Sequence, residues 1–115
     1  MTLKRGAETL VPRLEVADRM WSRTVGLLGR QQLPDEEALW IHRCNSVHTF
    51  FMQFAIDLVF CDRDLRVKKT CARVQPWRLV WPVWGATSVI EFNAGFLDRH
   101  PLAVGEKLHV DTALS

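Results

Sequence analysis

Residues 58–74, LVFCDRDLRVKKTCARV, carry the clearest indication of fold in this chain. The segment opens with a short apolar run at 58–61, continues through the polar stretch Asp62-Arg63-Asp64 and resumes at 66–74. A short apolar run bounded by turn-forming residues is typical of a buried strand. Two such segments across a short polar turn predict a β-hairpin, here without the Asn-Gly pair of the tightest turns.

Further short strands are predicted on both sides of this hairpin. Their apolar or alternating patterns occupy residues 14–16, 38–43, 47–52, 89–94 and 107–110. Asn45 and Ser46 favour a turn between the second and third of these segments. Pro76 and Pro82 exclude a long helix between them, and a short helical turn is expected around 96–100. The pattern predicts a mainly β fold, with α+β as the alternative class. We expect a β-sandwich or partly closed barrel of six to seven short strands.

One longer helix is predicted between the first two of these strands, over residues 19–28. Trp21 and Leu28 lie on one face of this helix at helical spacing. Asp18 suits its N-terminus, because the side-chain oxygen accepts a hydrogen bond from a free amide of the first turn. Gly29 favours the left-handed conformation that ends a helix. The helix is expected to pack against the sheets.

The chain has 115 residues, of which 48% are apolar and 24% charged, with five Trp and six Phe. This length and composition are typical of one domain with its own core. Residues 1–115 are therefore expected to form a single domain, with 1–12 as a flexible arm or an edge segment. The net charge of +2 is too small to indicate a nucleic-acid partner by itself.

Neither membrane insertion nor export is indicated. No stretch reaches the ~18 apolar residues that a membrane span needs, and the first residues lack the apolar segment of a signal peptide. The three cysteines, Cys44, Cys61 and Cys71, form neither an even set nor a CxxC pair. Reduced thiols in a cytoplasmic protein explain them most simply. We therefore expect a cytoplasmic protein without a membrane partner.

Four ordered segments carry a family resemblance: GLLGRQQLP at 26–34, VHTFFMQFAIDLVFCDRD at 47–64, SVIEFNAG at 88–95 and VGEKLHV at 104–110. With these separations the chain resembles the family called domain of unknown function 192 (DUF192), over residues 14–110. The resemblance implies a compact, jelly-roll-like β fold of bacterial and archaeal proteins, and it implies no activity. It singles out Asp57 and Glu91 as acidic residues. Phe51 and Ala55 stand where Trp and Pro are common in the family.

The candidate metal ligands are four even-numbered residues: His42, Cys44, His48 and Met52. On an uninterrupted strand they would share one face, and imidazole, thiolate and thioether groups suit soft metals. Their spacing, however, fits no established zinc pattern. Core packing of Cys44 and Met52, with both histidines hydrogen-bonded, is the favoured alternative. We therefore predict no metal and no cofactor.

Cys44 and His48 also form a candidate nucleophile and base. A catalytic thiol needs a lowered pKa and a partner that orients its histidine, for which Asp57 or Glu91 is the candidate. Each carboxylate lies in an apolar run, where burial is costly unless the charge is paired or hydrogen-bonded. The two can serve acid–base chemistry. The favoured interpretation is structural, with each binding backbone amides or an arginine such as Arg30.

Trp77, Trp81 and Trp84 follow a basic stretch at residues 63–78. Aromatic side chains beside cations can stack on the bases and contact the phosphates of single-stranded nucleic acid. Tryptophan is also enriched at protein interfaces, and small cores need large side chains. We rank core or loop packing first, a protein interface second and nucleic acid through residues 63–84 third.

The leading hypothesis is a small non-catalytic binding or accessory module that recognises a small ligand or a protein partner. The alternative is a metal-binding protein or an enzyme built on the Cys44 and His48 region. The ligand-binding candidates are Cys44, His48, Met52, Asp57 and Glu91. Convergence of these groups on one cavity would favour the enzyme, whereas an exposed tryptophan-rich patch would favour an interface.

Overall fold

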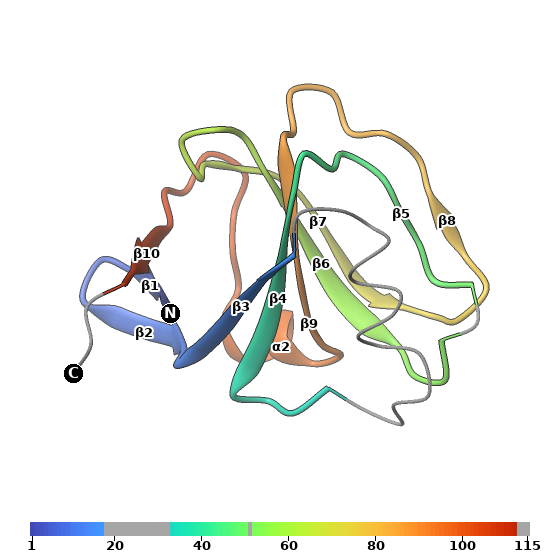
Figure 1. Ribbon diagram of the computed structural model, residues 1–115, viewed down its shortest axis with the longest axis horizontal. Coiled ribbons are helices and arrows are strands. Elements are labelled where there is room, and N and C mark those ends of the chain that lie inside the picture. Colours follow the sequence, from blue (N-terminus) through green and yellow to red (C-terminus); the bar gives the residue numbers. More distant parts are fainter. Residues whose placement is uncertain (18–32, 51, 113–115) are drawn as a thin grey trace.

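A computed structural model describes residues 1–17, 33–50 and 52–112 (Figure 1). The predicted hairpin lies within its largest sheet: β6 (Ile56–Cys61) and β7 (Val67–Val74) pair antiparallel. The other strands of this sheet are β9 (Ser88–Asn93), β4 (Glu37–His42) and β3 (Arg13–Ala17). The order of the five strands is β3-β4-β9-β6-β7, and the β3–β4 pair is parallel whereas the other pairs are antiparallel.

The strands β6 and β9 are buried on both faces of this sheet. All six residues of β6 and five of the six residues of β9 are buried. A strand covered on both sides reads as a continuous apolar run rather than an alternating one, which explains the run at 58–61. Asp57 and Glu91 are the charged residues within these two strands, and they are only 1% and 0% exposed.

A second sheet and a short helix cover one face of the five-stranded sheet. β1 (Thr2–Arg5) pairs antiparallel with both β2 (Glu8–Val11) and β10 (His109–Asp111). The helix α2 (Phe96–Arg99) follows β9, and Phe96 stacks on Phe92 with ring centroids 3.7 Å apart. The first core cluster contains Leu3, Leu10, Val11, Leu14, Ala38, Val59, Cys61, Val67, Ile90, Phe92, Phe96, Leu102 and Leu108.

A two-stranded sheet and its flanking segments cover the opposite face. β5 (Val47–His48) and β8 (Leu79–Val80) pair antiparallel, on the right of Figure 1. The second core cluster contains Ala17, Leu33, Ile41, Val47, Met52, Ile56, Leu58, Phe60, Val83, Ala86 and Val89. Leu58 belongs to this cluster whereas Val59 belongs to the first, as the alternation of side chains across a sheet requires.

The mainly β class and the sandwich-like arrangement predicted from the sequence are confirmed, and the sheets are open rather than closed into a barrel. The described residues form ten strands rather than six or seven. The additional strands include β1 and β2, where the sequence predicts a flexible arm or an edge segment, and the two-residue strands β5 and β8. The helical turn expected at 96–100 is α2. The helix predicted at 19–28, with its cap at Asp18 and its end at Gly29, lies outside the described residues.

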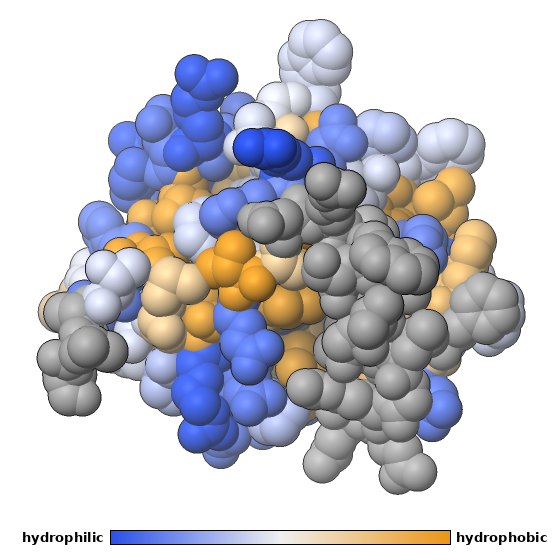
Figure 2. All heavy atoms as spheres, in the orientation of Figure 1, coloured by the Kyte–Doolittle hydropathy of each residue, from blue (hydrophilic) through white to orange (hydrophobic). Residues whose placement is uncertain are grey.

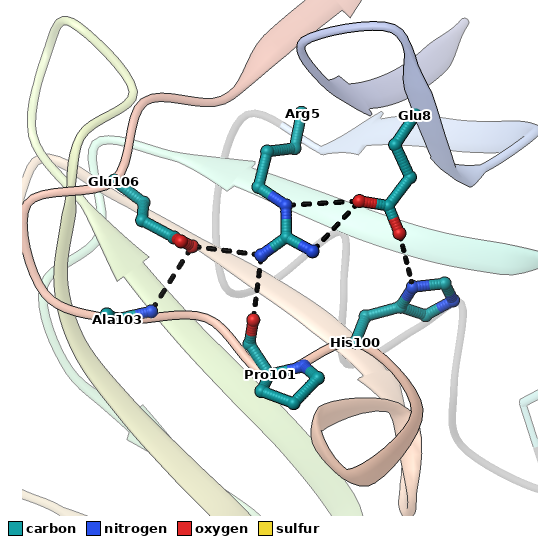
Figure 3. A network of polar contacts seen from close by, with 6 residues as sticks. All are labelled: Arg5, Glu8, His100, Pro101, Ala103 and Glu106. Carbon is teal, nitrogen blue, oxygen red and sulfur yellow. Dashed lines mark hydrogen bonds and ion pairs between the residues drawn. The ribbon is translucent and has the colours of Figure 1, made fainter.

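A polar network fastens the β1–β2 turn to the chain that follows α2 (Figure 3). Arg5 donates through Nε and Nη2 to Glu8. Its Nη1 donates to Glu106 and to the carbonyl oxygen of Pro101. Nδ1 of His100 lies 3.1 Å from the second carboxylate oxygen of Glu8. The hydrogen bond from Arg5, and next the one with His100, hold the pKa of Glu8 below its ordinary value.

Candidate functional site

A groove open to solvent crosses one rim of the sandwich, where β4 and β6 end and β9 begins. It consists of three adjoining cavities of about 240, 370 and 460 Å³. The first two share Arg43 and Thr87, and the last two share Asn45. We call this feature the rim groove. Its loops form the upper edge of Figure 1, and Figure 2 shows hydrophilic side chains gathered along that edge.

The first cavity of the rim groove has the most charged residues in its lining. The lining residues are Trp40, His42, Arg43, Asp62, Arg63, Thr87 and Ser88. They come from the end of β4, from the β6–β7 turn and from the start of β9. Chain segments that are distant in sequence are brought together here because β4, β9 and β6 are neighbours in the sheet.

Arg43 marks the point where the chain leaves β4. Its φ of 52° lies in the left-handed region, so the strand does not continue through it. Main-chain hydrogen bonds hold the loops that follow. The amide of Cys44 donates to the carbonyl of Thr87 at 3.1 Å, and the amide of Thr87 donates to the carbonyl of Cys61 at 2.8 Å. The backbone therefore frames the rim groove.

The first cavity carries a positive excess. Neither Arg43 nor Arg63 forms an ion pair within the part of the chain that the structure describes. Oδ1 of Asp62 accepts the amides of its own turn, from Asp64 at 2.9 Å and Arg66 at 3.0 Å. The hydrogen bond from the Arg66 amide is the main cause that lowers the pKa of Asp62. The cavity is thus lined by two arginines and by one aspartate whose carboxylate is already hydrogen-bonded.

Two buried polar atoms in this lining lack a hydrogen-bond partner among the described residues. They are Nε1 of Trp40 and Nε2 of His42. The two rings meet edge to face, with their centroids 4.2 Å apart. An indole N–H is a donor only, and a buried donor without an acceptor costs about 1–3 kcal/mol. An acceptor that enters the cavity and reaches Trp40 would remove that cost.

The structure does not bring His42 and Cys44 to one face. His42 shares its sheet face with Trp40, which packs against the first core cluster. Cys44 follows the turn at Arg43 and packs against the second cluster. Its thiol donates to the carbonyl of Ser46 at 2.9 Å. The shared face expected of an uninterrupted strand is absent because β4 ends before Arg43.

Asp57 and Glu91 lie on opposite faces of the five-stranded sheet. In the register of β6 with β9, Glu91 is opposite Leu58 and Asp57 is opposite Phe92. Directly opposed residues point to the same face, and successive residues of a strand point to opposite faces. The two carboxylates therefore do not form a paired acid–base site.

Asp57 binds main-chain amides. Its Oδ1 accepts the amide of Arg73 and its Oδ2 accepts the amide of Leu97, both at 2.8 Å. The pairing of β6 with β7 shifts between Ile56 and Leu58, and Arg73 has a φ of 52°. Such a bulge leaves an amide outside the strand ladder, and Asp57 accepts it. The carboxylate thereby joins β6 to β7 and to α2.

His48 and Met52 are not among the residues that line the first cavity. The ring of His48 stacks on Phe50 with centroids 5.0 Å apart, and Phe50 stacks on Trp77 at 5.9 Å. Met52 is 5% exposed, within the second core cluster. In residues 1–17, 33–50 and 52–112, no three His, Cys, Asp or Glu side chains are grouped as a metal site requires.

Burial lowers the acidity of two thiols. It raises the pKa of Cys61 to about 12, with a smaller contribution from the charge of Asp62. Burial also raises the pKa of Cys71. Because the thiolate is the nucleophilic form, neither group is an activated nucleophile. All three cysteines, including Cys44, are free thiols.

A group of large apolar side chains is exposed along the segment that follows β7. Trp77 is 57% exposed, Trp81 75% and Trp84 97%. Leu79 and Phe50 accompany them, at 52% and 38%. We call these five residues the tryptophan surface. The sequence ranks core or loop packing of the three tryptophans first, and these exposures contradict packing in the core.

Thr49 fixes the position of this segment. Its hydroxyl donates to the carbonyl of Gln75 at 2.6 Å and accepts the amide of Arg78 at 2.9 Å. Its own amide donates to the carbonyl of Arg78, and its carbonyl accepts the amide of Trp77. The backbone around Trp77 is therefore held in place by hydrogen bonds to Thr49.

Of the residues singled out from the sequence, His42, Cys44 and Trp84 line the rim groove. Trp40 and Arg43 were missed as site residues, and Arg63 was noted only as part of a basic stretch. The sequence feature that indicates this site is the pair Arg43 and Arg63, because each arginine lies in a turn that follows a strand. No sequence signal reveals that the indole N–H of Trp40 is buried without an acceptor, because this depends on strand pairing.

Fold and groove together define a small, sandwich-like β protein with an open, cationic groove at one rim. The chain belongs to the DUF192 family, described as "Uncharacterized ACR", whose model matches residues 1–110. This confirms the resemblance seen in the sequence, and the family has no assigned function. No helix among the described residues is long and apolar enough to cross a bilayer.

Individual relatives agree with this assignment. The chain is 31% identical over 104 residues to a UPF0127 protein of Thermococcus sibiricus, a match that covers 84% of this chain and 64% of that protein. It thus spans less than two thirds of that relative. A UPF0127 protein of Pyrococcus abyssi is 31% identical over 101 residues, which cover 84% of each chain. A crystal structure of a protein of unknown function from Novosphingobium aromaticivorans matches with a TM-score of 0.78 and 26% identity, over 95% of this chain and 82% of that one.

Proposed function

We propose that this protein is a non-catalytic binding module whose rim groove holds a small ligand through an oxyanionic group, a phosphate or a carboxylate. One observation carries the proposal. The buried indole N–H of Trp40 has no acceptor among the described residues. Trp40 is one of the residues that line the same cavity as Arg43 and Arg63, which have no ion-pair partner among the described residues.

The lining suits an oxyanion because it is rich in donors. Arginine presents several N–H groups in a planar fork that matches phosphate and carboxylate oxygens. The hydroxyls of Thr87 and Ser88 add further donors to the same cavity. With a volume of about 240 Å³, the first cavity has room for such a group, and the adjoining cavities leave space for the rest of the ligand.

Three features support a binding role over catalysis. Asp57 and Glu91 lie on opposite faces of the sheet. Both oxygens of Asp57 are occupied by main-chain amides. The thiols of Cys61 and Cys71 have raised pKa values.

We further propose a cytoplasmic setting and a single folded domain. Three free cysteines are consistent with a reducing compartment. The five-stranded sheet contributes residues to both core clusters. Because the two clusters share this sheet, they support a single domain rather than two.

Calorimetric titration of the full chain with inorganic phosphate tests the function. We expect one saturable site per chain, and succinate in a parallel titration distinguishes a carboxylate from a phosphate ligand. Arg43→Gln and Arg63→Gln should each weaken binding about tenfold, since a charge-assisted hydrogen bond contributes about 1.5–3 kcal/mol. Arg78→Gln is the matched control, because it removes an equal charge outside the first cavity. An equal loss in all three variants, or no saturable heat with either anion, would contradict the proposal.

A further inference from the structure

The sequence predicts no membrane partner, but from the exposed side chains we propose that the tryptophan surface binds the headgroup region of an anionic lipid bilayer. Trp84 lines the third cavity of the rim groove, but no residue of the tryptophan surface lines the first cavity. This inference does not depend on an oxyanionic ligand there.

The apolar side chains of this surface protrude along the segment from Trp77 to Trp84, with Phe50 stacked on Trp77. Five of the eight exposed large apolar residues in the described parts of the chain belong to it. Trp81 and Trp84, at 75% and 97% exposure, are the most exposed of these. Tryptophan has an apolar body and a polar N–H, and it is enriched where membrane hydrocarbon meets water.

Cations accompany these side chains. Arg78 lies between Trp77 and Leu79 in the chain. Lys68 reaches the loop after β8: its Cε would lie 3.0 Å from a Cβ at Gly85, the residue that follows Trp84. Neither Arg78 nor Lys68 forms an ion pair within the described residues. Basic residues beside a membrane-binding element are attracted to anionic headgroups.

The segment is also held in place before it binds. Thr49 fixes its first part through the hydrogen bonds to Gln75 and Arg78. The amide of Val83 donates to the carbonyl of Asn45 at 2.8 Å and fixes its second part. Because the backbone is already ordered, insertion of the side chains costs little conformational entropy.

A bilayer explains this surface better than the other partners that basic and aromatic residues attract. Single-stranded nucleic acid needs a positively charged groove along its backbone beside the stacking rings, but no cation among the described residues lines the cavity at Trp84. Protein interfaces bury their key residues inside a surrounding ring of contacts. A side chain that is 97% exposed, as Trp84 is, has almost no neighbours to supply that ring. Lipid can surround such a side chain from every direction.

Vesicle binding by the full chain tests the proposal. The probes are vesicles of phosphatidylcholine alone and of phosphatidylcholine with one-third phosphatidylglycerol. We expect the protein to sediment with the anionic vesicles at low salt, and tryptophan emission to shift to shorter wavelength. The affinity should be lower by about tenfold or more on the neutral vesicles and should fall as salt screens the headgroups.

Substitutions identify the binding surface. The double variant Trp81→Ser/Trp84→Ser should lose vesicle affinity by about tenfold or more, since each tryptophan buries large apolar area on insertion. Val104→Ser is the matched control, because Val104 is 70% exposed outside the tryptophan surface. It should bind vesicles as the parent chain does. Circular dichroism and thermal unfolding confirm that both variants are folded.

Three outcomes would overturn the proposal: no vesicle binding at low salt, equal binding by the double variant, or binding to a single-stranded oligonucleotide in place of vesicles. Phosphate titration of the rim groove uses Arg43 and Arg63, whereas this test uses Trp81 and Trp84. Failure of one therefore leaves the other standing.

Discussion

Asp57 shows how one buried carboxylate can organise several elements. It accepts one amide from the bulge in β7 and another from the start of α2. The sequence predicts a costly charge that must be paired, and it names backbone amides among the partners. It cannot name Arg73 and Leu97, because the partners depend on a register shift between two strands.

The substitution Asp57→Asn tests this role. The asparagine oxygen can still accept one amide, but its NH₂ group then faces the other N–H donor. We expect a loss of about 2–3 kcal/mol in the free energy of unfolding, since hydrogen bonds to a charged group are strong and a buried unsatisfied donor is costly. Urea unfolding measures the change. Asp64→Asn is the control at an exposed carboxylate, and an Asp57→Asn variant as stable as the parent would contradict the assignment.

Cys61 gives a prediction about alkaline pH. Burial raises the pKa of its thiol to about 12, above the ordinary value of 9.0. Above its unfolded-state pKa the unfolded chain releases the proton while the folded chain keeps it, so the unfolded state binds fewer protons. Stability is then complete below about pH 9 and falls by roughly 1.4 kcal/mol per pH unit as pH rises towards 12.

Urea unfolding between pH 8 and pH 10.5 measures this dependence. Cys61→Ala should show a shallower slope, because the variant lacks the titrating group. Identical slopes in the two proteins would exclude the thiol as the cause.

At the scale of elements, the strength of the periodic pattern decides what the sequence can predict. β6, β7 and β9 were predicted because they have continuous or alternating apolar patterns of sufficient length. β5 was expected to extend over 47–52 but has two residues, and its partner β8 also has two. Beyond β5, Thr49 forms side-chain hydrogen bonds to Gln75 and Arg78 in place of further strand pairing. The alternation of apolar and polar residues in the sequence does not predict such bonds.

The substitution Thr49→Val tests this anchoring. It keeps the shape of the side chain but leaves the carbonyl of Gln75 and the amide of Arg78 without the hydroxyl. We expect a loss of about 2 kcal/mol and faster hydrogen exchange at the Arg78 amide. Thr49→Ser retains the hydroxyl and should behave nearly as the parent. Slow exchange in Thr49→Val would show that the segment is held by other contacts.

At the scale of the whole molecule, the network around Arg5 links β1 and β2, near the start of the chain, to residues 100–106 near its end. We expect Arg5→Gln to lower the melting temperature by several degrees, because one guanidinium serves two carboxylates and a carbonyl. Arg13→Gln is the matched control, since Arg13 is an exposed arginine whose contacts with Glu36 and Glu37 are 3.6 Å long. A melting temperature equal to that of the control would contradict this role.

Acid should weaken the same network. The pKa of Glu8 is lowered in the folded state, so its contribution to stability is present at neutral pH and is lost as pH falls through that lowered pKa. In Arg5→Gln this acid sensitivity should be reduced. Thermal unfolding at neutral and acidic pH measures the difference.

At the same scale, the sequence predicted the class of fold but not the site. The even numbering of the two residues suggested a shared face for His42 and Cys44, and Arg43 breaks the strand between them. The rim groove instead joins Trp40 to Arg63, which meet only because β4 and β6 flank β9. Such neighbours follow from topology rather than from local pattern.

The most direct test of the rim groove is the indole N–H signal of Trp40 in a ¹⁵N-labelled chain titrated with phosphate at constant ionic strength. The chain has five tryptophans, and Trp40→Phe assigns the signal. We predict a saturable downfield shift of the Trp40 signal alone, which disappears in Arg63→Gln. A Trp40 signal that stays in place, or one that moves together with the other four, would contradict the proposed site.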